Sequence, residues 1–330
     1  MTTERQGWTT PGGRTGADGR AAGAWVPPAP GDAHAPTAAS PDRDRRRASS
    51  ARLRSVLDAA RIVLLMVSAL AFGLALNLLV GSRLEHRAAQ ARAYDTFRQE
   101  LALGTAPLRP TSDHRALALG TPMALLEIPS IGVKEVVGEG TTGTVLMSGP
   151  GHLRSSVFPG EVGTSVILGR AAAYGGPFGR LHDLRKGAHI TVITQGGTST
   201  FTVVDTRTAH ALIPVLAPGQ ARLTLATATG PAFVPSGVVW VDANDTATPF
   251  AAAPPPLVRV PPDERPLGVD TAPLGSFLLW LALLALVLAG ALWTWRHRGH
   301  AQAWVTFLAP VVLVAYFAAT HGSAMLPNLL

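Results

Sequence analysis

Three long apolar runs stand out along the chain. The first covers 62–80, carries no charge and has Asn77 as its strongest polar interruption. The second covers 274–293, and the third covers 304–322, where Pro310 interrupts it. Because about 20 consecutive apolar residues let a helix cross a bilayer, these runs predict three transmembrane helices.

Between the first two runs, the pattern changes to short alternating segments separated by Gly and Pro. Strands are predicted over 123–128, 134–140, 144–149, 165–169, 189–194, 200–206, 222–227 and 238–243. Gln195-Gly196-Gly197 predicts a tight hairpin, and 177–184 predicts one short helical turn. So many short strands indicate an all-β domain, a barrel or a sandwich, over 122–246.

The remaining segments are polar or rich in Pro and Gly. Residues 1–61 predict a disordered basic tail, since their first part holds few bulky apolar residues and their end is rich in arginine. Residues 81–121 predict an amphipathic helix over 82–103, acting as a stalk, followed by a linker. Residues 247–273 predict a Pro-rich extended spacer, and 294–303 predict a basic loop.

Charge predicts how the chain is oriented in a membrane. Arginines precede the first apolar run, and the loop 294–303 is also basic, which places both in the cytoplasm and the β-domain outside. A cleaved signal peptide is the alternative, but the tail before the run is far longer than a signal sequence allows. The net charge of +7 lacks a basic stripe with interleaved aromatics, so nucleic-acid binding is not expected.

Composition also limits the chemistry. The chain contains no cysteine, which excludes disulfides, cysteine metal sites and thiol catalysis. His182, His189 and His210 show no ligand spacing. No metal or cofactor is therefore expected.

Five motifs follow one another in the β-domain: 128–133 (IPSIGV), 149–152 (GPGH), 158–163 (FPGEVG), 175–184 (GGPFGRLHDL) and 224–227 (TLAT). Their order and spacing resemble the sortase family, and within it the membrane-anchored actinobacterial types. The resemblance implies an eight-stranded β-barrel. It also implies enzymes that cut a sorting signal and transfer it to an amine through a thioacyl intermediate.

The residues that would carry this chemistry are replaced. The histidine position of the family reads Arg170, the cysteine position reads Ala228, and the arginine position falls near Ser236. Ala228 has no nucleophilic atom, Arg170 remains protonated at neutral pH, and Ser236 supplies no cation for an oxyanion. We therefore expect a sortase-like pseudoenzyme.

A relocated active site is the alternative for catalysis. Its candidates are Ser148, Thr227, His152 and Asp183, which would need to meet within hydrogen-bond reach. His152 matches a non-catalytic position of the family and is expected to orient a loop. Asp183 lies on a polar turn, where a solvated carboxylate is the simpler interpretation.

The same end of the β-domain is the expected peptide groove, lined by His152, Arg170, Tyr174, Thr227 and Ala228. Arg170 forms either a salt bridge at the barrel rim or a cation that clamps a carboxylate at the groove mouth. A groove with a polar floor around Thr227 favours binding, whereas a groove filled by apolar side chains favours a rigid spacer.

The expected function is thus a membrane-anchored, extracytoplasmic binding protein without catalysis. Its expected partner is a sorting-signal peptide or another envelope protein, for example an active sortase. The alternatives are a transpeptidase or hydrolase with a relocated nucleophile, and a structural envelope module.

Overall fold

The structure is a computed structural model that describes residues 41–107, 117–208, 215–251 and 259–330. Residues 1–55 and 56–330 are two separate units, each considered by itself. The disorder predicted for 1–40 lies outside the described residues.

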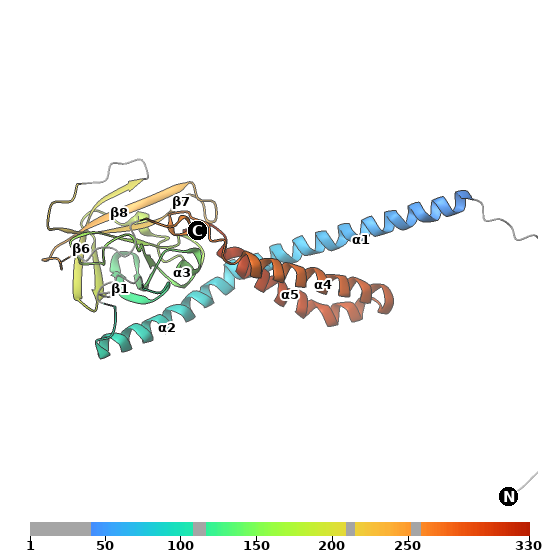
Figure 1. The fold of residues 1–330 in the computed structure, drawn as a ribbon, viewed down its shortest axis with the longest axis horizontal. Coiled ribbons are helices and arrows are strands. Elements are labelled where there is room, and N and C mark those ends of the chain that lie inside the picture. The colour runs from blue at the N-terminus through green and yellow to red at the C-terminus, as the bar shows by residue number, and fades with distance from the viewer. Residues whose placement is uncertain (1–40, 108–116, 209–214, 252–258) are drawn as a thin grey trace, which may run out of the picture. The chain divides into compact units, whose positions relative to one another are not determined.

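The predicted barrel is present and closed. Its strands are β1 (Pro122–Ile128), β2 (Val133–Glu139), β3 (Gly151–His152), β4 (Gly163–Leu168), β5 (His189–Thr194), β6 (Gly197–Thr208), β7 (Ala221–Thr229) and β8 (Gly237–Asp245). They close in the order β1-β2-β3-β4-β7-β8-β6-β5 (Figure 1). β5 and β6 form the predicted hairpin, with Thr194 paired to Gly197.

The alternation of apolar residues explains the core. Every second residue of a strand faces the same side, and the inward set includes Leu126, Ile167, Phe201, Leu225 and Val241, all fully buried. Burying each such side chain contributes about 1.5–3 kcal/mol, so this alternation fixes which face of each strand points inward.

One predicted strand is wrong. Residues 144–149 were expected to be extended, but Gly143–Ser148 form a short helix, α3. Thr142 caps it, because its hydroxyl oxygen accepts a hydrogen bond from the Val145 amide. Val145, Leu146 and Met147 are buried, and this packing overrides the β-propensity of the segment. The predicted helical turn is present at Leu181–Asp183.

The helix predicted over 82–103 is confirmed as α2 (Ser82–Leu103). It does not stand free as a stalk, because it packs along the barrel. Phe97 is 1% exposed and lies in an apolar cluster with Leu125 and Val136. Gln90 accepts a hydrogen bond from the Val136 amide at 2.7 Å and donates one to the Val136 carbonyl at 3.1 Å.

The basic segment expected to be disordered is helical from Pro41 onward, because α1 covers Pro41–Leu76. Arginine, alanine and leucine favour helices, and extending an existing helix avoids the cost of nucleation. A short π-helical turn, Asn77–Gly81, joins α1 to α2. Asn77, the polar interruption of the first apolar run, is fully buried and donates to the Thr320 hydroxyl at 2.8 Å.

The last two apolar runs form α4 (Leu274–Arg298) and α5 (His300–Ala324). Pro310 does not break α5. The expected loop 294–303 is largely helical instead, because only Gly299 separates the two helices. The basic residues Arg296, His297 and Arg298 end α4, where the helix dipole favours positive charge.

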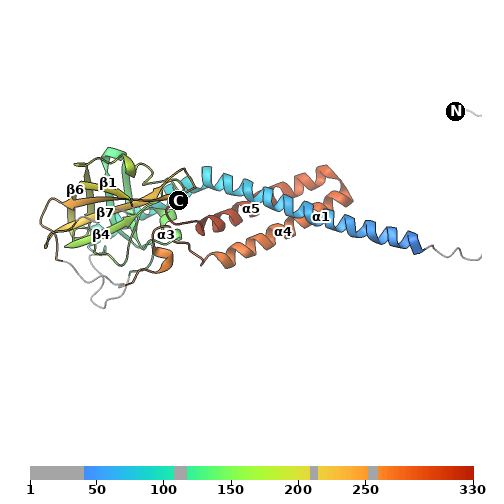
Figure 2. The ribbon, with the colours of Figure 1, turned by 90° about the horizontal axis from the view of Figure 1, so that it is seen from above.

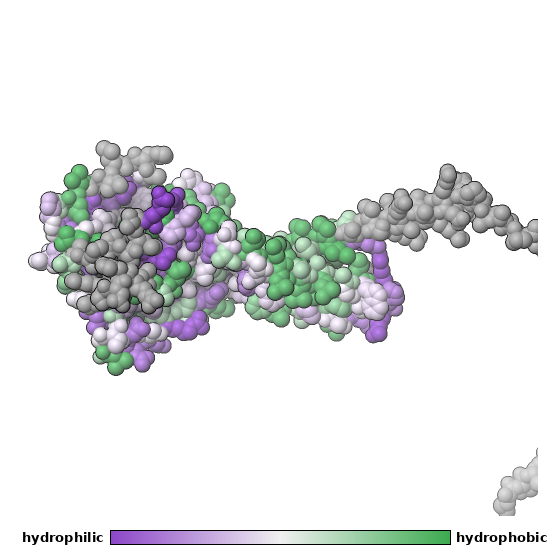
Figure 3. Space-filling view, viewed as in Figure 1, coloured by the Kyte–Doolittle hydropathy of each residue, from purple (hydrophilic) through white to green (hydrophobic). Residues whose placement is uncertain are grey.

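Three helical segments are long and apolar enough to cross a membrane: Ala60–Leu103, Leu274–Arg298 and Ala301–Ala324. Figure 2 shows α1 beside α4 and α5, and residues of all three helices share one apolar cluster. In Figure 3 the visible face of α4 and α5 is predominantly hydrophobic, whereas the barrel surface mixes both kinds of residue. The three helices can therefore anchor the barrel to a membrane.

Candidate functional site

The ends of two parallel strands bring together the positions that the sequence singled out. β4 pairs with β7 in a register that joins Val166 to Thr224 and Leu168 to Ala226. Arg170 follows the end of β4 by two residues, and Ala228 is the last residue but one of β7.

Arg170 is fully buried. Its guanidinium donates to three backbone carbonyls: Gly143 at 2.9 Å, Leu146 at 3.1 Å and Leu330 at 3.3 Å. Within the described part of the chain, no Asp or Glu side chain forms an ion pair with it, so the expected salt bridge to such a side chain at the barrel rim is not present. Burial lowers its pKa to about 10, which still leaves it positively charged at neutral pH.

Tyr174 lies beside this cation rather than in an open groove. The Arg170 guanidinium carbon lies 5.0 Å from the centre of the Tyr174 ring, a favourable cation–π distance. The Tyr174 hydroxyl lies 2.7 Å from the hydroxyl of Ser323, in the last turn of α5. Burial raises the pKa of Tyr174 to about 12, which exceeds the lowering by its hydrogen bond to Ser323.

A groove of about 450 Å³ opens beside Ala228. Its walls include Ala171, Ala228, Phe233 and Leu330, so small and apolar groups dominate it, and apolar side chains do not fill it. Thr227 does not line this groove. The residue is only 2% exposed, and its hydroxyl donates a hydrogen bond to the Gly169 carbonyl at 2.8 Å. Thr227 is therefore not part of the groove floor, and His182 and Thr229 supply polar groups to the groove instead.

The loop between β7 and β8 forms the exposed wall of this groove. Phe233 is 40% exposed and Val234 is 64% exposed. Phe233 also adopts a φ of 65°, a left-handed conformation that is costly for a bulky residue. Ser236 closes the loop, with its amide and hydroxyl both donating to the Thr229 carbonyl. No Lys or Arg of the described residues lines the groove.

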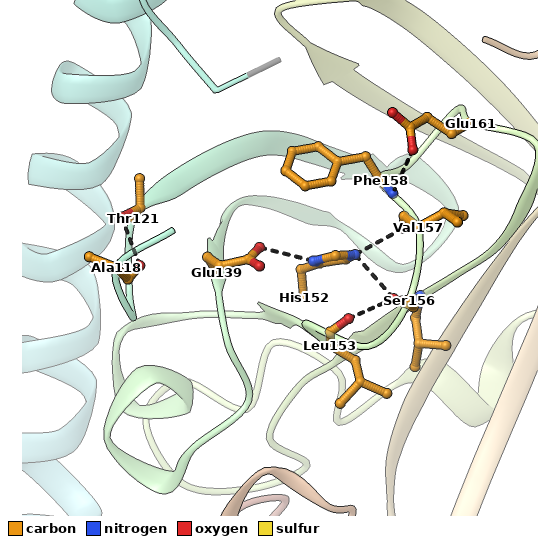
Figure 4. A network of polar contacts seen from close by, with 10 residues as sticks. Ala118, Thr121, Glu139, His152, Leu153, Ser156, Val157, Phe158 and Glu161 are labelled. Atoms are coloured by element: carbon orange, nitrogen blue, oxygen red, sulfur yellow. Dashed lines mark hydrogen bonds and ion pairs between the residues drawn. The ribbon is translucent and has the colours of Figure 1, made fainter. Parts of the chain in front are cut away.

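His152 lies elsewhere, in a buried polar network on the β3–β4 side of the barrel (Figure 4). Its Nδ1 is 2.9 Å from Glu139, and its Nε2 is 2.9 Å from the Val157 carbonyl and 3.1 Å from the Ser156 hydroxyl. A serine, a histidine and a carboxylate therefore line up in the order of a catalytic triad. The sequence did not single out Ser156 or Glu139.

The donor and acceptor roles argue against catalysis by this arrangement. The Val157 carbonyl can only accept, so Nε2 carries a proton and cannot act as a base toward Ser156. The Ser156 hydroxyl itself donates to the Leu153 carbonyl at 2.8 Å and accepts from the Val166 amide at 3.0 Å. The network instead holds the loop after β3, and Ser156 remains an ordinary hydroxyl.

The remaining candidates do not converge. Ser148 is exposed on α3, and Asp183 pairs with Arg180 and His182 on an exposed turn. His210 lies outside the described residues. Across the ranges that the structure describes, no group of three His, Cys, Asp or Glu side chains could hold a metal ion.

The segment after β8 contributes to the same end of the barrel. We expected 247–273 to be an extended spacer, but in its described part Glu264 is 1% exposed and forms an ion pair with Arg154. This carboxylate raises the pKa of Arg154, against the lowering effect of burial. The Thr141 hydroxyl donates to the Glu264 carbonyl at 2.7 Å, so this part of the chain packs on the barrel.

Comparison with known proteins relates the β-domain to sortases. Residues 126–241 match the family model of the Sortase domain. Sortase D of Bacillus subtilis (strain 168) is 32% identical over 88 residues, which make up 27% of this chain and 43% of that protein. The chain thus spans less than half the length of this relative.

Solved sortase structures are also similar. A Clostridium perfringens Sortase D5 transpeptidase is 18% identical with a TM-score of 0.40, covering 48% of this chain and 99% of that one. Sortase E from Streptomyces avermitilis is 25% identical with a TM-score of 0.35, covering 40% of this chain and 91% of that one. The domain match and the closed eight-stranded barrel confirm the predicted relation to sortases and the predicted fold.

Proposed function

We propose that this protein is a membrane-anchored, sortase-fold binding protein that holds a sorting-signal peptide or a partner envelope protein without cleaving it. One observation carries the proposal: Ala228, at the cysteine position of the family, lies near the end of β7 and lines the groove. Ala228 has no nucleophilic atom. The Arg170 guanidinium is turned into the protein and bound to carbonyls, so it cannot shuttle a proton to a leaving group.

The groove beside Ala228 supports a binding role. Its volume of about 450 Å³ lies within the usual range of about 300–1,000 Å³ for ligand sites. The exposed, strained Phe233 offers an aromatic anchor of the kind that contributes most to peptide binding. Small residues on the opposite wall leave room for a peptide backbone.

We also propose the orientation of the chain in the membrane. The arginine-rich segment before residue 62 and the basic end of α4 would lie in the cytoplasm. The barrel would then lie on the extracytoplasmic side, where sorting signals and envelope partners are found. The protein would be a multi-pass cell-membrane protein.

The experiment uses the full chain in lipid nanodiscs and a library of fluorogenic sorting-signal peptides. Binding and cleavage are recorded in the same samples, for the unmodified chain and for Phe233→Ala. Leu119→Ala is the matched control, because Leu119 is 50% exposed and does not line the groove. We expect binding without cleavage, and we expect Phe233→Ala, but not Leu119→Ala, to weaken binding about tenfold or more. Equal peptide affinity in Phe233→Ala and the unmodified chain would contradict binding in this groove.

The relocated nucleophile is tested in the same samples. Among the described residues, Ser156 is a hydroxyl that lies beside a histidine and a carboxylate, so a hydrolase built there would lose cleavage in Ser156→Ala. Because Nε2 of His152 is hydrogen-bonded to the Val157 carbonyl, we expect no cleavage by the unmodified chain or by Ser156→Ala.

A further inference from the structure

Residues 325–330, which follow α5, pack against the barrel. Asn328, Leu329 and Leu330 are all at most 5% exposed. The backbone of Asn328 donates to the Gly268 carbonyl at 3.0 Å. Its side-chain amide lies 2.8 Å from the Thr141 carbonyl and 2.9 Å from the Arg265 carbonyl. This asparagine therefore fixes the segment 325–330 between the barrel and the chain that follows β8.

The next two residues lie at the positions that define the candidate site. The Leu329 carbonyl accepts a hydrogen bond from the Ala171 amide at 2.9 Å. The Leu330 carbonyl accepts from Arg170 at 3.3 Å. Leu329 also belongs to an apolar cluster with Leu168 and Ala226, against which Ala228 packs. Leu330 is one wall of the groove itself.

These contacts are those of a bound peptide. A backbone carbonyl pairs with the strand end, a branched side chain fills an apolar pocket, and a buried cation binds the next carbonyl. Backbone hydrogen bonds combined with side-chain pockets are a common mode of peptide recognition. Here the bound segment is a turn, in which the Leu330 amide donates to the Pro327 carbonyl at 3.1 Å. Arg170, at the family's histidine position, is thus a ligand-holding residue for a segment of its own chain.

One feature makes the segment displaceable. The Oδ1 atom of Asn328 is buried and has no hydrogen-bond partner among the described residues. A buried acceptor without a partner weakens binding relative to a fully satisfied one. The segment also follows α5 directly, and Ser323 contacts Tyr174, so a movement of α5 would pull on it.

We propose that residues 325–330 are an intramolecular ligand that closes one end of the groove and competes with external peptides for it. This inference rests on the proposed function, because the competing external peptide is the ligand proposed there. The ligand class that follows is a short peptide with a branched apolar side chain next to an asparagine, bound by backbone carbonyls at Arg170 and Ala171.

The first test measures whether residues 325–330 occupy their site beside Arg170 and Ala171, independently of any external peptide. Hydrogen exchange at the Ala171 amide reports whether Leu329 is bound, in the full chain in nanodiscs. Asn328→Ala should speed this exchange tenfold or more. Asn244→Ala is the matched control, because Asn244 accepts a hydrogen bond from Arg222 and does not touch the segment. Unchanged exchange in Asn328→Ala would overturn the proposal.

Competition is measured with a fluorescein-labelled, amidated peptide of the sequence Met-Leu-Pro-Asn-Leu-Leu. It should bind the chain whose residues 325–330 are replaced by Gly and Ser at least tenfold more tightly than the unmodified chain. Adding Arg170→Lys should weaken that binding, with circular dichroism confirming the fold. Equal binding to both chains would refute the competition. Failure of the sorting-signal library alone, with this peptide still bound, would reject only the proposed function.

Discussion

The buried network around His152 gives the most quantitative prediction. If His152 holds the loop after β3, its removal should destabilise the barrel, whereas a purely catalytic His152 could be removed with little loss of stability. His152 and Glu139 have side chains that are 0% and 1% exposed, and their closest atoms are 2.9 Å apart. Replacing His152 by Ala leaves the Glu139 carboxylate buried without a partner. Breaking a buried pair in this way costs about 3–5 kcal/mol. Since about 1.4 kcal/mol is a factor of ten, barrel opening should become more frequent by a factor of about a hundred or more.

The assay is hydrogen exchange of the β3 and β4 amides in the full chain in nanodiscs, which reports opening of this part of the barrel. Glu139→Gln added to His152→Ala should recover about 2 kcal/mol, because a neutral amide is far less costly to bury than a charge. Ser156→Ala should cost about 1–3 kcal/mol, since the Val166 amide loses its acceptor.

The refuting result is specific. If His152→Ala changed the opening free energy by less than about 1 kcal/mol and at the same time abolished a peptide-cleaving activity, His152 would be catalytic. The loop-holding role would then be rejected.

Three further predictions follow from other contacts. Phe97→Ala should weaken the packing of α2 on the barrel by about 3–5 kcal/mol, measured by exchange of the α2 amides, because Phe97 is 1% exposed. Tyr174 should ionise near pH 12, above the ordinary value of 10; an absorbance titration should lose this late step in Tyr174→Phe. Because the folded pKa is raised, the stabilisation from neutral Tyr174 is complete below pH 10 and is lost as pH rises toward 12. Gln90→Ala should free the Val136 amide and carbonyl and speed exchange at Val136 tenfold or more.

The barrel could be predicted from the sequence because its evidence is local. Alternation along β5 and β7, the hairpin at Gly196 and the bounds of α2 follow from period and turn chemistry. The relation to sortases follows from motifs within the same segment.

The failures have a common physical cause, which is contact between distant parts of the chain. α3 was predicted as a strand because Val145 and Leu146 favour one, but its surroundings are supplied by Arg170 and the segment 325–330. Arg170 was expected to meet a carboxylate, yet its partner Leu330 lies 160 residues further along. No sequence pattern indicates that pairing.

The buried histidine network was missed for a related reason. Glu139, His152 and Ser156 are close in sequence, but nothing in their spacing shows that all three face inward. The sequence also gives no sign that the Val157 carbonyl accepts a hydrogen bond from Nε2 of His152. Only the geometry separates a loop-holding histidine from a catalytic one.

The central proposal is that this sortase-like barrel forms no acyl-enzyme intermediate, and intact mass spectrometry tests it directly. The full chain in nanodiscs is incubated with sorting-signal peptides, beside the Arg170→His/Ala228→Cys variant, and both the protein and the peptides are weighed. We predict an unchanged protein mass and intact peptides for the unmodified chain. A covalent peptide adduct or cleaved peptide, lost in Ser156→Ala, would contradict the account and identify the nucleophile.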